Sequence, residues 1–183
     1  GHDKVRKAMA RWYEQAILNA RKNSKAQEYH NSIEDLFAAG MTPPNPKMFC
    51  DHINVFDCSK VSDGASALMI TSEEGLKKIG VDKSKAAELV GFGVAVADLT
   101  KAPPDHTKMS TVAKAVEQAY QMTGLGPQDI GVLEVHDCFT IGGILELEAA
   151  QFAGYGEGFD FVLEGKTKPD GEIPTNTTGG LIG

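Results

Sequence analysis

The sequence predicts an α/β fold, and both its apolar pattern and its composition support this class. Apolar runs suited to buried strands alternate with segments of helical periodicity, most regularly in the second half of the chain. Parallel strands require crossover connections, and the intervening helices would supply them. The 183 residues are 42% hydrophobic and 23% charged, which is typical of a globular protein that buries a sizeable core.

The first third of the chain is predicted to be helical and then irregular. Helical spacing of apolar residues over residues 3–22 predicts an amphipathic helix with a solvated basic face. Ser32 followed by Asp35 is typical of a helix start, and Gly40 suits the end of that short helix. Three prolines within residues 41–49 argue against regular structure there. The apolar positions of the first helix are Val5, Met9, Trp12, Ala16 and Ala20.

Two strands and a helix are predicted for the middle of the chain. The apolar residues 67–71 read as a strand, and Ser72 is then expected to cap a helix that ends near Gly80. The longer apolar run at residues 87–99 predicts a strand buried on both faces. A new structural half is therefore expected to begin near residue 84.

The last third continues the alternation of helices and strands. Ser110 is expected to cap a helix that ends just before Gly124, and residues 130–135 read as a strand. A further helix is predicted over residues 142–154. Residues 168–183 carry a Pro-Asp-Gly turn and then a glycine-rich loop.

Charge and hydropathy exclude several classes of partner. The net charge is −7 with acidic and basic residues interspersed, so the chain has no basic surface for nucleic acid. No apolar run approaches the roughly 20 residues that span a bilayer, and the N-terminal sequence lacks the apolar core of a signal peptide. The sequence therefore predicts a soluble cytoplasmic protein, or a peroxisomal one in a eukaryote.

The cysteines and the two ends of the sequence carry further expectations. Cys50, Cys58 and Cys138 are an odd set without CxxC spacing, which argues against a disulfide framework and fits a reducing compartment. The histidines and acids near them match no zinc pattern, so no metal site is expected. The sequence begins with glycine and ends in a flexible loop, so we expect both ends to be cuts in a longer chain.

The stretch VLEVHDCFTIGG at residues 132–143 carries the candidate site. Its apolar run stops at His136 and a helix is expected to begin soon after, and α/β folds place ligand and catalytic groups at such junctions. The positive end of a helix favours a thiolate or a developing oxyanion nearby, which makes Cys138 a candidate reactive thiol. His136 would point the same way as Cys138 on an extended backbone, and an imidazole can donate a hydrogen bond or exchange a proton.

A purely structural interpretation of the same stretch stays open. In that interpretation Cys138 is a small buried hydrophobic residue, because cysteine is often buried for packing alone. His136 is then a hydrogen-bonded core histidine, and Asp137 caps the following helix. The local pattern does not decide between the two interpretations.

Three segments together resemble one known family. VSDGASALMITS, GLGPQDIGVLEVHDCF and IPTNTTGGLIG, in this order and at these spacings, resemble segments of the thiolase family, and most closely its sterol-carrier-protein type, in which HDCF replaces Asn-Glu-Ala-Phe. The resemblance covers residues 58–183 and implies a layered, thiolase-like fold. Residues 1–83 would hold the loop region and the last strand and helix of the N-terminal half. Residues 84–183 would form a truncated C-terminal half.

The resemblance implies an acyltransferase of fatty acid and lipid metabolism. Thiolases form or cleave a 3-ketoacyl-CoA by Claisen chemistry through an acyl-cysteine, and donors stabilise the thioester oxyanion or enolate. A coenzyme A thioester is the substrate, and neither a metal nor a redox cofactor is required. The full-length protein is expected to bind acyl-CoA and coenzyme A and to form a homodimer or homotetramer.

The resemblance also assigns roles to residues of the candidate site. His136 would help to build an oxyanion hole, and Cys138 would face the same pocket. Asp137 would be a structural acid and Phe139 a wall of the pocket. The loop that would approach the pocket from the next turn consists of Thr178, Gly179 and Gly180.

The sequence departs from the family pattern in ways that leave two alternatives open. Neither Cys50 nor Cys58 lies in the context of the family's nucleophilic cysteine, and Gly-His-Pro and a late Cys-x-Gly do not occur in these residues. Residues 176–178 read Asn-Thr-Thr where Asn-Pro-Ser is usual. The segment alone is therefore expected to be inactive. The alternatives are a noncatalytic acyl-CoA-binding or scaffold subunit and a thiolase-fold retro-aldolase that acts on CoA esters.

Overall fold

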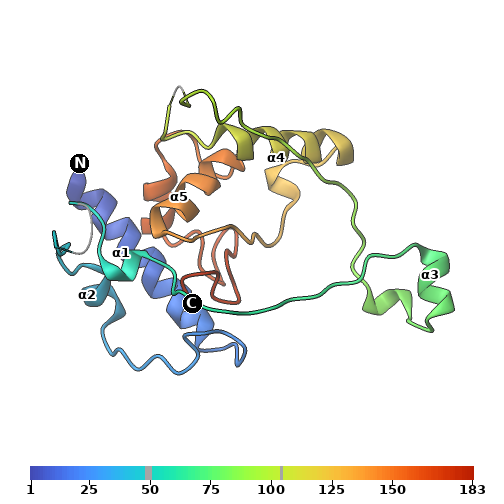
Figure 1. Ribbon diagram of the computed structural model, residues 1–183, viewed down its shortest axis with the longest axis horizontal. Coiled ribbons are helices and arrows are strands. Elements are labelled where there is room, and N and C mark those ends of the chain that lie inside the picture. Colours follow the sequence, from blue (N-terminus) through green and yellow to red (C-terminus); the bar gives the residue numbers. More distant parts are fainter. Residues whose placement is uncertain (48–50, 104) are drawn as a thin grey trace.

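The computed structural model describes residues 1–47, 51–103 and 105–183 (Figure 1). Cys50 and the last part of the predicted 41–49 loop lie outside these residues. The α-helices are α1 (His2–Ala20), α2 (Leu36–Gly40), α3 (Glu73–Lys78), α4 (Ser110–Thr123), α5 (Thr140–Ala149) and α6 (Gly158–Leu163). Short 3₁₀ helices occur at η1 (Val55–Asp57), η2 (Lys83–Lys85) and η3 (Pro127–Asp129). No helix in the described ranges is long and apolar enough to cross a membrane.

Helix α1 is the central element of the packed part of the molecule, in contact with α2, α5 and α6 (Figure 1). Trp12 lies in a hydrophobic cluster with residues of α5 and α6. Tyr13 lies in a second cluster, which Leu36 of α2 and Ile182 complete. The predicted first helix is confirmed, with its ends within two residues of the predicted ones. The predicted apolar positions that the structure buries are Met9, Trp12, Ala16 and Ala20.

The two clusters join the first 20 residues of the chain to its last third. Ile144 and Leu147 of α5 are fully buried against the same face of α1 that carries Trp12. Such burial contributes about 1.5–3 kcal/mol for each large apolar side chain, which makes α1 and α5 one packing unit. The predicted division of the chain near residue 84 stays a prediction.

The start of α2 differs from the prediction. Asp35, not Ser32, is the N-cap residue, because its carboxylate accepts a hydrogen bond from Ala38 N at 2.8 Å. An N-cap acceptor satisfies one of the amide groups that lack a partner within the helix. The helix therefore begins later than the Ser32 signal suggests. Gly40 is its last residue, as predicted, and Cβ at this position would lie 2.8 Å from Cα of Ala10 in α1.

The other predicted helix ends are confirmed in part. Ser72 caps α3, since its hydroxyl accepts from Gly75 N at 3.2 Å. Gly124 ends α4 in the left-handed region with φ of 71°, which glycine adopts without strain. The prediction that Ser110 caps α4 is wrong, because Ser110 is the first helical residue and the N-cap position is Met109.

The three predicted strands are not confirmed, so the structure does not confirm the α/β class. Within the described ranges, β pairing consists of two isolated bridges, Cys58 with Phe139 and Leu133 with Thr175. Residues 67–71 belong to the long excursion that carries α3 away from the packed part, and residues 87–99 lead back from it past α4 (Figure 1). A strand is defined by hydrogen bonds to a neighbouring strand, and the described chain places none beside these residues. Their apolar side chains are exposed, as at Leu68 (81%) and Val96 (89%).

The last third of the chain folds around α5. This helix begins and ends earlier than the predicted 142–154 helix. Gln151 follows it with φ of 68°, a left-handed conformation that cannot continue an α-helix. Helix α6 comes next, and Gly171 N donates to Lys168 O at 2.8 Å in the predicted Pro-Asp-Gly turn. The chain then returns beside residues 133–135 and ends against α1.

Candidate functional site

The candidate site lies where a short extended segment meets the start of α5. Burial differs along this segment: His136 is exposed, Asp137 is fully buried, Cys138 is half-buried and Phe139 is 42% exposed. We call the side that carries the buried carboxylate of Asp137 the inner side of the segment and the side open to solvent the outer side. His136 is exposed on the outer side, and Cys138 follows Asp137 at a bend of the chain. Their participation in catalysis stays a prediction.

Asp137 joins three segments of the chain. Its Oδ2 accepts a hydrogen bond from Nε1 of Trp12 at 2.9 Å, and its Oδ1 accepts from Leu181 N at 2.6 Å. Burial raises the pKa of Asp137, and the hydrogen bonds from Trp12, Leu181 and Asn176 oppose that rise. The alternative in which Asp137 caps α5 is wrong, because the N-cap residue is Phe139 and no side chain caps the helix.

The predicted 178–180 loop meets the inner side of the site. A Cβ atom on Gly180 would lie 2.5 Å from Oδ1 of Asp137, and φ of this glycine is 66°. No other residue fits there without strain or displacement of the carboxylate. Gly179 packs against Ala20 of α1, and the carbonyl group of Thr178 accepts from Asn23. The loop therefore packs closely against the carboxylate of Asp137 on the inner side of the segment.

Asn176 is a structural residue of the site that the sequence did not reveal. Its side-chain oxygen accepts from Val135 N at 2.8 Å, and its Nδ2 donates to Val135 O at 3.2 Å. The amide side chain pairs with the backbone of Val135 just as a neighbouring strand does. Its φ of 47° turns the main chain away at this point, and asparagine tolerates this conformation better than most residues. Asn176 therefore fixes the residue that directly precedes His136.

Three amide side chains of α1 and the residues that follow it hold the same loop. We call Gln15, Asn19 and Asn23 the amide ladder, since they are spaced four residues apart and lie along one side of the helical path. Their Nε2 or Nδ2 atoms donate to carbonyl groups within residues 175–178, at 3.1, 3.0 and 3.1 Å in that order. The four-residue spacing of these side chains is visible in the sequence. Their hydrogen-bond acceptors are not, because they are backbone carbonyl groups, which every residue has.

Glu146 of α5 is a second residue that sequence reasoning missed. Its Oε2 accepts a hydrogen bond from His136 N at 3.0 Å. Burial raises the pKa of Glu146, and the His136 contact opposes the rise while the charge of Asp137 adds to it. An acidic residue within the largely apolar TIGGILELEA helix was the available signal.

The opposite flank of the site is formed by η1. Ser59 N donates to Cys138 O at 2.9 Å, next to the bridge between Cys58 and Phe139. Asp57 is fully buried, and its Oδ1 accepts from Oγ1 of Thr140, the first residue of α5. A second link runs from Asp57 to Arg6 of α1, whose two terminal nitrogens bind both carboxylate oxygens at 2.5 and 2.6 Å. A bidentate pair of this kind fixes geometry strongly.

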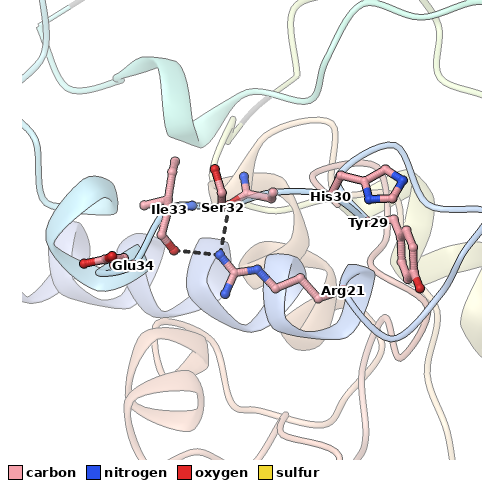
Figure 2. A pocket seen from close by; sticks show the side chains of 7 residues that line it. Arg21, Tyr29, His30, Ser32, Ile33 and Glu34 are labelled. Atoms are coloured by element: carbon pink, nitrogen blue, oxygen red, sulfur yellow. Dashed lines mark hydrogen bonds between the residues drawn. The ribbon is translucent and has the colours of Figure 1, made fainter.

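A shallow hollow beside the end of α1 lies apart from these residues. Figure 2 shows Arg21 reaching from the end of this helix to the segment that carries Ile33. Its Nη2 donates to Ile33 O at 2.6 Å and to Oδ1 of Asn31 at 3.0 Å. The rings of Tyr29 and His30 meet edge to face at its other end, 4.7 Å apart. Arg21 is thus occupied in closing the 23–35 loop on the helix.

A second hollow runs between α1 and α6 with the loop at residues 168–170. The lining residues of neither hollow include His136, Cys138 or Gly180. In the part of the chain that the structure describes, no group of three or more histidine, cysteine, aspartate and glutamate residues is arranged to hold a metal ion. The outer side of the 136–139 segment therefore stays the candidate site on chemical grounds.

Comparisons with known proteins agree with the sequence resemblance. Residues 94–183 match the family described as "Thiolase C-terminal domain-like". The acetyl-CoA acetyltransferase of Methanothermobacter thermautotrophicus is 35% identical over 139 residues, which are 75% of this chain and 35% of that protein. Sterol carrier protein 2 of Rattus norvegicus is 34% identical over 137 residues, covering 72% of this chain and 25% of that one.

A solved structure shares the fold. The "Ltp2-ChsH2(DUF35) aldolase" superposes with a TM-score of 0.81 at 24% identity, over 97% of this chain and 46% of that chain. At this identity the likeness concerns the fold alone. The aligned residues thus span about a third or less of the two curated relatives and about half of the solved chain.

Proposed function

Residues 94–183 belong to the thiolase family as a C-terminal domain-like segment, and from this premise we propose that the whole protein is an acyltransferase of the thiolase type. Its reaction is the formation or cleavage of a 3-ketoacyl-CoA by Claisen chemistry, with coenzyme A thioesters as substrates. The name of the Methanothermobacter thermautotrophicus relative supports this class. The nucleophilic cysteine of the reaction would come from sequence outside residues 1–183.

One observation carries the proposal for the site. Asp137 is held on the inner side by Trp12 and Leu181, and its two neighbours in the chain, His136 and Cys138, are exposed and half-buried. Side chains held in this way can act on one bound molecule without reorganisation.

The side chains of His136 and Cys138 have complementary roles in the proposed reaction. A ring N–H group of His136 donates a hydrogen bond to the thioester oxygen as negative charge develops there. The thiol of Cys138 exchanges a proton with the reacting carbon, since a carbanion equivalent is formed or consumed in Claisen chemistry. Phe139 lies on the same segment, is 42% exposed and would form a wall of the substrate pocket. Neither step requires a metal or a redox cofactor.

The experiment that tests the proposal measures thiolysis of a 3-ketoacyl-CoA by the complete gene product. His136→Ala should lower kcat by about 10²–10³-fold, the usual loss for an oxyanion donor. Cys138→Ala should lower it by about 10²–10⁴-fold, as expected for an acid or base. His30→Ala is the control, because His30 lines the separate hollow of Figure 2 and should leave the rate unchanged.

Unchanged thiolysis in both site variants would refute the proposed roles. Mass spectrometry of the protein mixed with acyl-CoA separates the alternatives, since a thiolase accumulates an acyl-enzyme. Binding of CoA esters without an adduct would favour the noncatalytic alternative. Cleavage of a CoA ester without an acyl-enzyme would favour the retro-aldolase.

The remaining parts of the proposal concern organisation. Residues 1–83 belong to the loop region and N-terminal half of the thiolase, and residues 84–183 to its C-terminal half. The complete protein forms a homodimer or homotetramer and acts in the cytoplasm or, in a eukaryote, in peroxisomes. Light scattering of the complete gene product measures the oligomeric state directly. A monomer would contradict the proposed homodimer or homotetramer.

A further inference from the structure

Helix α5 carries two half-buried glutamates that bind main-chain N–H groups. Oε2 of Glu146 accepts from His136 N at 3.0 Å. Oε1 of Glu148 accepts from Gly158 N at 2.9 Å, at the first residue of α6. The two contacts have the same chemistry and nearly the same length, but only the first one reaches the candidate site.

The Glu146 contact holds the site segment at His136, between the two points where the other contacts act. The inner anchors described above act on Asp137 through its side chain and on Val135 through its backbone. His136 lies between these two residues and sends its own N–H group to Glu146 on α5. The contact therefore ties the backbone of His136 to a helix whose Ile144 and Leu147 are fully buried.

From these contacts we propose that Glu146 is a positioning residue that holds His136 in its productive place. This inference rests on the proposed function, since it assigns the role of Glu146 through His136. A charge-assisted hydrogen bond to a backbone N–H group is among the stronger kinds of hydrogen bond. Catalytic donors need placement to within about 0.5 Å, and a shift of about 1 Å can cost roughly 100-fold in rate.

The test compares three variants in the complete gene product. Glu146→Ala removes the acceptor and should lower kcat about 10–100-fold, with KM within about 2-fold, because substrate binding does not involve this carboxylate. Glu146→Gln keeps a side-chain oxygen that accepts the same hydrogen bond and should restore kcat to within about 3-fold. Glu148→Ala is the matched control and should stay within about 2-fold of the wild type, because Glu148 holds α6 instead.

Two kinetic outcomes would overturn the proposal. One is a kcat for Glu146→Ala equal to that of Glu148→Ala. The other is a Glu146→Gln variant as slow as Glu146→Ala, because the hydrogen bond would then not be the cause.

Amide hydrogen exchange tests, independently of activity, whether Glu146 holds the backbone of His136. Glu146→Ala should speed exchange at His136 at least about 10-fold, and Glu148→Ala should do the same at Gly158 only, because an opened hydrogen bond loses its protection. Unchanged exchange at His136 would overturn the positioning role. A wild-type protein without acyl transfer would refute the proposed function, and the exchange rates would still show whether Glu146 holds His136.

Discussion

Trp12 and Asp137 are 125 residues apart in the sequence, and the indole N–H group of one binds the buried carboxylate of the other at 2.9 Å. Trp12 is the only tryptophan of the chain. Its ring lies against α5 at Gly143, and its Nε1 reaches the residue between His136 and Cys138. Helix α1 thus helps to fix the position of the site segment through Asp137. It contributes no residue to the predicted chemistry.

The hydrogen bond between Trp12 and Asp137 should be measurable as a coupling energy. Trp12→Phe keeps an aromatic ring but leaves Oδ2 of the buried carboxylate without the indole donor, while Oδ1 keeps Leu181 N, so the free energy of unfolding should fall by about 1–3 kcal/mol. Asp137→Ala and the double variant complete a double-mutant cycle by urea unfolding. The coupling should lie at about 0.5–3 kcal/mol. Strict additivity of the two changes would show that the bond contributes nothing.

Stability should depend on pH through Asp137. Because burial raises its pKa in the folded state above the value in the unfolded chain, its contribution is fully present below the unfolded pKa. That contribution is lost as the pH rises through the folded pKa, since the carboxyl group must then ionise while buried. The raised pKa of Glu146 acts in the same direction.

The measurement compares the free energy of unfolding of the wild type with that of Asp137→Asn at each pH. Urea unfolding followed by Trp12 fluorescence should give a free energy of unfolding that decreases more with rising pH in the wild type than in the variant. The exposed acids with lowered pKa values, such as Glu73 and Asp98, are common to both proteins and cancel. A difference curve that rises with pH would contradict the assignment.

The two adjacent glycines of α5 should respond oppositely to alanine. A Cβ atom on Gly143 would lie 2.3 Å from Cζ2 of Trp12, so Gly143→Ala should destabilise the protein by about 1–3 kcal/mol. On Gly142 the nearest atom would be His136 O at 3.8 Å, an ordinary contact. Gly142→Ala should therefore stabilise the protein by up to about 1 kcal/mol through helix propensity. Urea unfolding at pH 7 checks the order, and equal effects would refute the Trp12 explanation.

The amide ladder should show a gradient from buried to exposed positions. Asn19 is 2% exposed and donates to Asn176 O, which also accepts from Gly179 N, so Asn19→Ala removes one buried hydrogen bond and should cost about 0.5–1.5 kcal/mol. The corresponding bond of Asn23 to Thr178 O lies at the surface, where water replaces the lost donor. Asn23→Ala should change the free energy of unfolding by less than about 0.5 kcal/mol in thermal or urea unfolding. Equal losses at both positions would show that burial does not set the contribution.

Elements that depend on local pattern were predictable from the sequence. Helix α1 follows from the spacing of Met9, Trp12 and Ala16, because an amphipathic helix satisfies its own backbone and needs only one apolar contact face. The cap at Ser72 and the left-handed end at Gly124 follow from local chemistry in the same way. Ser32 failed as a cap signal because Asp35, three residues later, offers an equally good acceptor.

Elements that depend on distant partners were not predictable. Residues 67–71 have the composition of a strand, but a strand also needs a neighbour, which composition cannot supply. The stretch around His136 stands out in the sequence because reactive side chains interrupt an apolar run, and its catalytic role stays a prediction. The contact made by Glu146 was not predictable, since its partner is a backbone N–H group, and every residue has such a group. That Trp12 is the partner of Asp137 follows only from the fold.

The central place of α1 has a consequence for synthesis. Within residues 1–183 the ribosome makes this helix before the other elements, yet several partners of its apolar face, among them Ile144, Leu147 and Ile182, come from the last third of the chain. At about 5–20 residues per second, the 125 residues between Trp12 and Asp137 require roughly 6–25 s. During that interval α2 can already cover Tyr13, but the side of α1 that carries Trp12 still lacks Ile144 and Leu147, which bury it in the folded protein. Chaperones that bind this uncovered side are therefore expected to raise the fraction of newly made chain that reaches the folded state.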